Sequence, residues 1–203
     1  MIGKCKAIAH GSTALDYIFR EGKLGYRLAF HNLCSREPKT IYEEMKVVSD
    51  YNSRCRNKFL RIEIGIAPQD EKKLPVSEYM WIAHLFAKRI GLDNHQWVAV
   101  THKDTDNRHI HIIANRISLY GEVFDTTFVS NRAARVAEEI SREKGLTIAK
   151  EIKAERKLLL SAKHRNPHSN SLRHNSSDDS MLVTSPLIHF LLPRVAIQPL
   201  LQA

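Results

Sequence analysis

Two apolar segments separated by a short polar one limit the fold of this chain more than any other feature. The first runs from Trp97 to Thr101 and the second from Ile110 to Ile117. Residues 103–108 between them are all charged or polar, and they are too few for a crossover connection, which needs a dozen residues or more. The two segments are therefore predicted to be antiparallel strands of one hairpin.

Three histidines mark this hairpin and predict a metal site. His109 and His111 are two residues apart on a strand, so their side chains share one face. The hairpin turn can bring His102 across from His109. Three neutral imidazoles leave coordination positions open for water and substrate oxygens, as in catalytic metal sites and unlike closed structural ones. Nitrogen ligands suit zinc, manganese, nickel or cobalt better than magnesium.

Two polar residues beside the histidines are candidates for supporting roles. Asp104 could accept the second ring N–H of a ligand histidine and so fix its tautomer. Asn115 is expected on the same strand face as His109 and His111, where it could do similar work or orient a phosphate. A single His–x–His pair is common on strands that bind no metal, so the prediction depends on His102 and Asp104. Of the other histidines, only His10 is kept as a further neighbour.

The remaining pattern predicts an α+β fold, an antiparallel sheet with helices packed on it. Alternating apolar residues predict strands over 4–10, 59–66, 97–102, 109–117 and 122–124, with a strand or irregular crossing over 26–34. Helical spacing predicts helices over 14–20, 37–51, 76–90, 131–144 and 149–162. Ser12 or Thr13 is expected to cap the first helix, and Gly91 to end the helix over 76–90. That helix should bury Val76, Tyr79, Met80, Ala83, Ala87 and Ile90.

The composition changes near Lys163 and predicts three regions. Residues 1–150 should form one folded domain and 151–163 a charged helix. Residues 164–203 should form a disordered or non-native tail. The tail is rich in Ser, Asn and His at first, then apolar but interrupted by prolines. It fits neither an amphipathic helix nor a membrane span.

The charge balance predicts a polyanionic partner. The formal net charge is +9 and the pI is about 9.6, which favours nucleic acid or an acidic membrane surface. The three cysteines form no CxxC pair, and the N-terminus lacks the apolar segment of a signal peptide. We therefore expect a cytoplasmic protein that has no membrane partner.

The hairpin resembles a motif of one known family. His102-x-Asp104-x4-His109-x-His111-x3-Asn115-Arg116 is similar to the third motif of plasmid mobilisation relaxases, which are HUH endonucleases of the Mob group. The resemblance covers about residues 1–150. It implies an HUH-endonuclease-like fold and nicking of one DNA strand at an origin of transfer. It also implies magnesium or manganese as the ion in use, with zinc, nickel or cobalt as alternatives, and accessory relaxosome and coupling proteins as partners.

The same resemblance implies a tyrosine nucleophile. The segment from Leu15 to Lys23 is similar to the helix that carries it in this group, which points to Tyr17, with Tyr26 as the second candidate. From the residues alone, Tyr17 would be a half-buried tyrosine on a helix. A phenol is a weak nucleophile at neutral pH, so a cation, base or metal must favour its ionised form. The product is expected to be a 5′-phosphotyrosyl adduct.

Two features depart from the family pattern and keep other functions open. The strand over 59–66 often carries a serine near its end, where this chain has Ile64-Gly65-Ile66, and the apolar tail is atypical. A catalytically inactive DNA-binding accessory protein of the same fold is one alternative. A metal-dependent hydrolase of small phosphoesters, without a tyrosine nucleophile, is another.

Basic residues on the loops and near the motif are candidates for contacts with the DNA backbone. Those closest to Tyr17 and to the histidines are Arg20, Lys23, Arg108 and Arg116. Others are Arg27, Arg54, Arg56, Lys58 and Arg132. Tyr26 and Phe30 could stack on unpaired bases.

Overall fold

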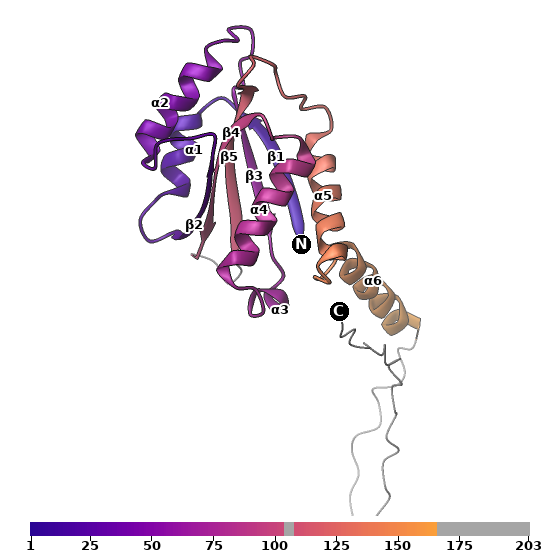
Figure 1. Ribbon diagram of the computed structural model, residues 1–203. Helices are drawn as coiled ribbons and strands as arrows, with labels where there is room; N and C mark the ends of the chain where they lie inside the picture. The colour runs from indigo at the N-terminus through magenta and orange to yellow at the C-terminus, as the bar shows by residue number, and fades with distance from the viewer. Residues whose placement is uncertain (104–107, 166–203) are drawn as a thin grey trace, which may run out of the picture. The chain divides into compact units, whose positions relative to one another are not determined.

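The core of the molecule is one five-stranded sheet in which every pair of neighbouring strands is antiparallel (Figure 1). The computed structural model describes residues 1–103 and 108–165, with side chains to residue 161. The strands are β1 (Ile2–Ile8), β2 (Leu24–His31), β3 (Phe59–Gly65), β4 (His95–His102) and β5 (His109–Ser118), in the spatial order β1-β3-β5-β4-β2. The predicted fold class is therefore confirmed.

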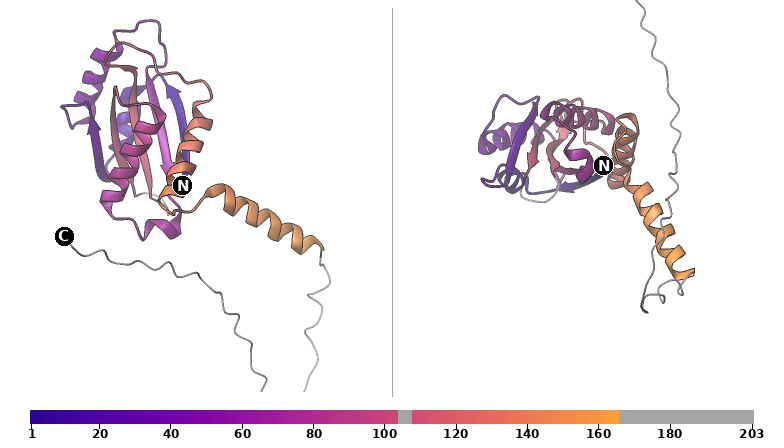
Figure 2. Two further views of the ribbon diagram at one scale, coloured as in Figure 1. Left: turned by 45° about the vertical axis from the view of Figure 1, so that its right-hand side comes forward. Right: turned by 90° about the horizontal axis from the view of Figure 1, so that it is seen from below.

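Helices cover the two faces of this sheet unequally (Figures 1 and 2). They are α1 (Gly11–Ile18), α2 (Pro38–Ser49), α3 (Pro68–Glu71), α4 (Val76–Ile90), α5 (Val129–Glu143) and α6 (Ala149–Arg165). Helices α1 and α2 pack against β4 and β5 through Leu15, Ile18 and Met45. Helices α4 and α5 cover the opposite face and form the larger apolar core with it. No described helix is long and apolar enough to cross a membrane.

Compact packing divides the chain into two units, residues 1–162 and 163–203. The predictions for the tail fall almost entirely outside the described residues, and the expected domain boundaries stay predictions.

Several helix starts and faces differ from the sequence predictions because tertiary packing decides them. Helix α1 begins at Gly11 with His10 as its N-cap, and no side chain caps it, so the predicted Ser12 or Thr13 cap is wrong. Gly11 is buried against the Phe59 ring, where a Cβ atom would lie only 2.5 Å from ring carbons. This close packing places the first turn one residue before the expected hydroxyl cap.

The apolar face of α4 is also rotated from the predicted one. Met80 is 41% exposed, whereas Ile82 and Phe86 are fully buried between the sheet and α5. The end of the helix was predicted correctly, because Gly91 adopts a left-handed conformation with φ of 101°. The short strand expected over 122–124 is reduced to one isolated bridge between Ile117 and Val123.

His95 lies before the predicted strand over 97–102, but it is the first residue of β4 and is only 6% exposed. Its Nδ1 atom lies 2.9 Å from the Asn115 carbonyl oxygen, and its ring meets the Phe124 ring edge-on. Burial lowers the pKa of His95, and the bond to the Asn115 carbonyl opposes this effect. The protonated imidazole is therefore less stable in the folded chain than in water.

This burial predicts a pH dependence of stability. With a folded pKa below the ordinary 6.5, the unfolded chain takes up the proton first as the pH falls. The contribution of His95 is complete above about pH 6.5 and is lost below it. We expect the thermal unfolding midpoint to fall less between about pH 7 and pH 5 in His95→Gln than in the wild type. The exposed control His10→Gln should keep the wild-type slope, and the same slope in His95→Gln would contradict the assignment.

Candidate active site

The hairpin of β4 and β5 places the three motif histidines at one end of the sheet. His102 lies directly opposite His109, and Val100 lies opposite His111, so the predicted register is confirmed. Nitrogen atoms of the three imidazoles all lie within 4.8 Å of one another. The ring centroids are 5.4 Å apart for His102 and His109, 4.1 Å for His102 and His111, and 4.6 Å for His109 and His111. Such a cluster could hold one metal ion.

Helix α1 orients one of these imidazoles. The Nε2 atom of His102 lies 3.1 Å from the Ile18 carbonyl oxygen, which can only accept a hydrogen bond. Nε2 therefore carries the proton, and Nδ1 has the lone pair that could bind a metal. The sequence pattern had suggested Asp104 for such a role. Asp104 lies outside the described residues, and no side-chain pattern could have pointed to a backbone carbonyl.

Tyr17 lies on the same helix and faces the cluster. The centroid of its ring is 5.4 Å from that of His102 and 6.0 Å from that of His111. Two cations flank the ring, because Lys23 Nζ is 5.0 Å and the Arg20 guanidinium carbon 5.9 Å from its centroid. The structure thus brings together Tyr17, Arg20, Lys23 and the histidines.

Tyr26, the second candidate for the nucleophile, is turned toward other elements. Its backbone N–H donates to Thr101 Oγ1 at 2.8 Å. The guanidinium of Arg108 lies over the rings of both Tyr26 and Tyr79, and Tyr79 belongs to the core under α4. Tyr26 is therefore associated with the α4 side of the sheet, whereas Tyr17 lies on the α1 side.

Two of the four basic candidates do not join the histidine cluster. Arg108 is held toward α3, where its backbone N–H donates to Glu71 and its guanidinium forms an ion pair with the same carboxylate at 3.6 Å. Arg116 lies seven residues after His109 on β5 and donates to the backbone carbonyls of Phe124 and Asn57. Both side chains hold parts of the fold together.

Asn115 has a structural environment that differs from the predicted supporting role. It is fully buried, and its Nδ2 atom donates to the Met45 carbonyl at 2.7 Å and to Gln96 Oε1 at 3.1 Å. Its Oδ1 atom accepts the Ile117 N–H at 3.0 Å. Asn115 also lies four residues beyond His111, about 13 Å along the strand. The structure therefore does not bring it to the histidines.

Replacement of Asn115 by alanine should lower the free energy of unfolding by about 2–4 kcal/mol, because several buried polar groups lose their partners. Urea denaturation would measure this loss, with the exposed Asn131→Ala as control. A variant with wild-type stability but without DNA cleavage would instead restore a catalytic role for Asn115.

Glu63 and Gly65 on β3 are neighbours of the cluster that the sequence did not reveal. Glu63 lies directly opposite His111, and Gly65 lies opposite His109. Glu63 forms an ion pair with Arg61 at 3.3 Å. The strand over 59–66 was predicted, but nothing local indicated that β3 would lie beside β5.

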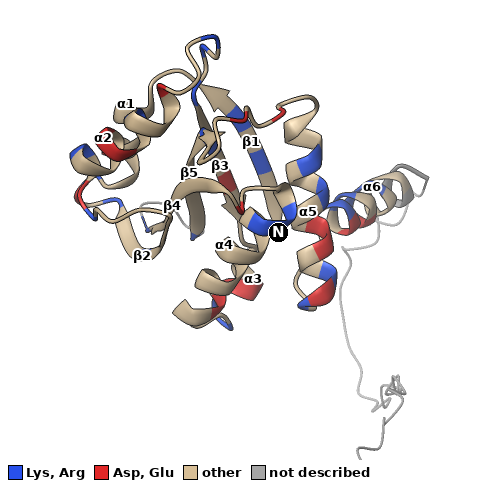
Figure 3. Ribbon diagram, turned by 45° about the horizontal axis from the view of Figure 1, so that its top comes forward, with Lys and Arg blue, Asp and Glu red and all other residues tan. Residues whose placement is uncertain are grey.

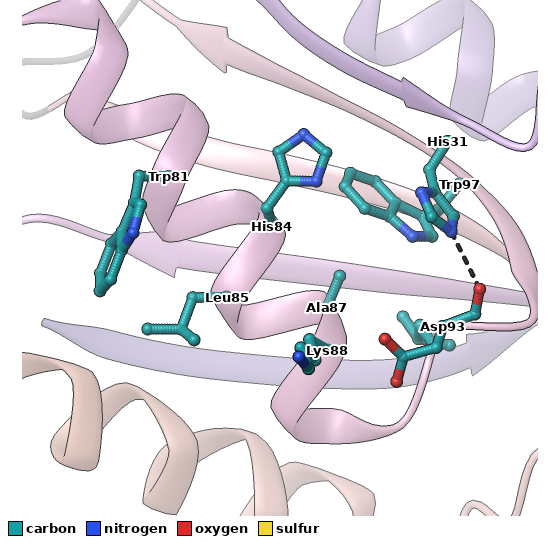
Figure 4. A pocket seen from close by; sticks show the side chains of 9 residues that line it. His31, Trp81, His84, Leu85, Ala87, Lys88, Asp93 and Trp97 are labelled. Atoms are coloured by element: carbon teal, nitrogen blue, oxygen red, sulfur yellow. Dashed lines mark hydrogen bonds between the residues drawn. The ribbon is translucent and has the colours of Figure 1, made fainter.

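A separate pocket lies at the other end of β4 (Figure 4). It has a volume of about 270 Å³ and is formed by α4 and the ends of β2 and β4. His31 stacks on Trp97 with ring centroids 5.0 Å apart and donates from Nε2 to the Asp93 carbonyl, while His84 meets the edge of the same indole. These two histidines, which were left out of the predicted site, therefore surround a core tryptophan.

One family model matches the chain. This model, described as relaxase, MobA/VirD2-like, nuclease domain, matches residues 17–146, which is more than half of the chain. The matched region contains Tyr17 and all three clustered histidines. No curated protein matches the chain.

Proposed function

The chain belongs to the MobA/VirD2-like relaxase nuclease family, and on this premise we propose that it nicks one strand of a mobile element at its origin of transfer. The observation that carries the proposal is the position of Tyr17 against the histidine cluster, with Arg20 and Lys23 beside its ring. Relaxase-type nicking is the activity of the family. Cleavage at an origin of transfer and a covalent intermediate on Tyr17 are what we propose beyond the activity of the family.

The proposed reaction is a transesterification. The Tyr17 phenolic oxygen attacks the phosphorus atom, the bond to the 3′ oxygen of the preceding nucleotide breaks, and the 5′ phosphate becomes a tyrosyl ester. The phenol loses a proton and the departing 3′ oxygen gains one. No water enters the bond, so a free 3′ hydroxyl can attack the ester and restore the DNA strand.

The side chains around Tyr17 have separate roles in this proposal. Arg20 and Lys23 favour negative charge on the phenolic oxygen and on the phosphate. When bound by His102, His109 and His111, a divalent ion supplies positive charge that polarises the phosphate oxygens. We propose magnesium or manganese in use, with zinc, nickel or cobalt as alternatives that imidazole ligands favour. Asp104 stays proposed as a second partner of a ligand imidazole.

Other parts of the proposal concern the setting of the reaction. The substrate is single-stranded or nicked DNA at the origin, presented by accessory relaxosome proteins, and a coupling protein takes over the product. Such DNA implies action in the cytoplasm. Asn115 was expected to support the site, and we propose that it contributes only by stabilising the fold through its buried hydrogen bonds.

The decisive experiment uses the full chain and a supercoiled plasmid that carries the cognate origin. With a divalent ion present, the plasmid should become nicked and a protein–DNA adduct should survive denaturing electrophoresis. DNA binding without nicking under any of the five ions would favour the inactive accessory protein. Steady hydrolysis of bis-p-nitrophenyl phosphate without an adduct would favour the small-phosphoester hydrolase.

A further inference from the structure

Part of the sheet face that carries the histidines is left uncovered by α1 and α2, and most of its described side chains are exposed. Helices α1 and α2 pack over β4 and β5, and α1 reaches β1 and β3 only near Ile8 and Phe59. On the remaining part of β1 and β3, alternate residues are exposed on this face, while Cys5, Ile62 and Ile64 on the other face are buried in the core beneath α5 and α4. This open part is called the β1–β3 strip below and consists of Ile2, Lys4, Lys6, Arg61, Glu63 and Gly65.

The strip continues directly from the histidine cluster. One row across the sheet runs from His111 to Glu63 to Lys4, and the next runs from His109 to Gly65 to Ile2. Neighbouring strands are about 4.8 Å apart, so β1 lies about 10 Å from the strand that carries the histidines. A linear polymer bound at the histidines can therefore pass over Glu63 and reach Lys4 within this distance.

The charge of the strip is basic and mostly uncompensated. Lys4 and Lys6 are exposed on β1, and Arg61 lies opposite Lys6 on β3. Figure 3 shows basic positions along the β1 ribbon. Glu63 is paired with Arg61. Among the described residues, neither lysine of the strip forms an ion pair. Some basic residues on α4 and at the end of α5 are instead paired, because Arg89 binds Glu143 and Lys144 binds Glu78.

The dimensions of the strip favour one nucleic-acid strand over a duplex. It is two β-strands wide, about 10 Å, and α1 borders it on the histidine side. Phosphate groups bind lysine and arginine without regard to sequence, so a short row of cations can hold a backbone. Ile2 is 52% exposed in the row beside His109 and offers an apolar surface to a base or sugar.

We propose that the β1–β3 strip binds the phosphate backbone of the single DNA strand on one side of the nick, with Lys4, Lys6 and Arg61 as its contacts. The proposal rests on the proposed function for the identity of the ligand. It adds an extended binding surface to that function, formed by residues outside the histidine hairpin and outside the helix that carries Tyr17.

The test measures binding without cleavage. A short fluorescein-labelled single strand of mixed sequence is titrated with the full chain in EDTA, and anisotropy is followed at several salt concentrations. Lys4→Ala/Arg61→Ala should weaken binding by about tenfold at about 0.1 M salt and reduce the salt slope by about 1.4, the value for two lost phosphate contacts. The charge-matched control Lys88→Ala/Arg135→Ala changes exposed residues of α4 and α5 and should bind within about twofold of the wild type.

A second variant tests the two lysines of the strip without changing the ion pair between Arg61 and Glu63. Since loss of Arg61 leaves Glu63 without its partner, Lys4→Ala/Lys6→Ala keeps the ion pair and should lose affinity to a similar extent. Equal losses in the control, or unchanged salt slopes in both strip variants, would overturn the proposal. The binding assay needs neither an ion nor Tyr17. A negative result in the adduct assay and a negative result for DNA binding by the strip can therefore be distinguished.

Discussion

Tyr17→Phe should abolish the covalent protein–DNA adduct and reduce nicking by at least about a thousandfold, because the variant lacks the nucleophilic oxygen. The aromatic ring stays in place against His102 and His111, and the cations Arg20 and Lys23 keep their ring contacts. Single-strand affinity should therefore remain within about threefold of the wild type, as long as the hydroxyl makes at most one ordinary hydrogen bond to the DNA. Loss of chemistry with retained binding identifies a nucleophile rather than a residue needed for folding.

Tyr26→Phe is the matched control for this experiment. It also removes a phenolic hydroxyl, but from a tyrosine that contacts Arg108 and lies on the α4 side of the sheet. The control should form the adduct at the wild-type rate. An adduct formed by Tyr17→Phe would refute the assignment, and mass spectrometry of the labelled peptide would then show whether Tyr26 carries the DNA.

The parts of the site that the sequence predicted depend on local geometry. Strand alternation alone puts His109 and His111 on one face, and a short polar loop leaves few registers for His102. The predicted pairing of His102 with His109 followed from these two constraints. The role of Tyr17 could not be predicted in this way. Without the family resemblance, nothing distinguished it from an ordinary half-buried tyrosine on a helix.

The parts that could not be predicted depend on contacts between segments far apart in the chain. The order β1-β3-β5 places Glu63 beside His111 and Lys4 beside Glu63, but no local pattern specifies which strands become neighbours. Arg108 is adjacent to a motif histidine in sequence, yet Glu71 holds it toward α3. Asn115 lies on the predicted strand face, but α2 and Gln96 occupy its amide. In each case a distant partner determines the role of the side chain.

His109→Ala should remove most of the thermal stabilisation that a divalent ion gives the protein. An ion at a concentration of about one hundred times its Kd stabilises the folded state by about 2.7 kcal/mol. For a unit of this size, that corresponds to a rise of about 5–10 °C in Tm. His109 is the least buried of the three histidines, so its removal disturbs the core least. The Tm shift should fall below about a third of the wild-type shift, and nicking should fall by at least about a hundredfold.

His84→Ala, in the separate pocket around Trp97, is the control and should keep the full shift with every ion. Equal shifts in His109→Ala and the wild type would mean that the stabilising ion binds elsewhere. His102→Ala should behave differently from His109→Ala even in EDTA, because His102 also donates to the Ile18 carbonyl at the end of α1. Its Tm without metal should therefore be lower by several degrees. This difference is expected if His102 both contributes to the ion site and holds the end of the helix that carries Tyr17.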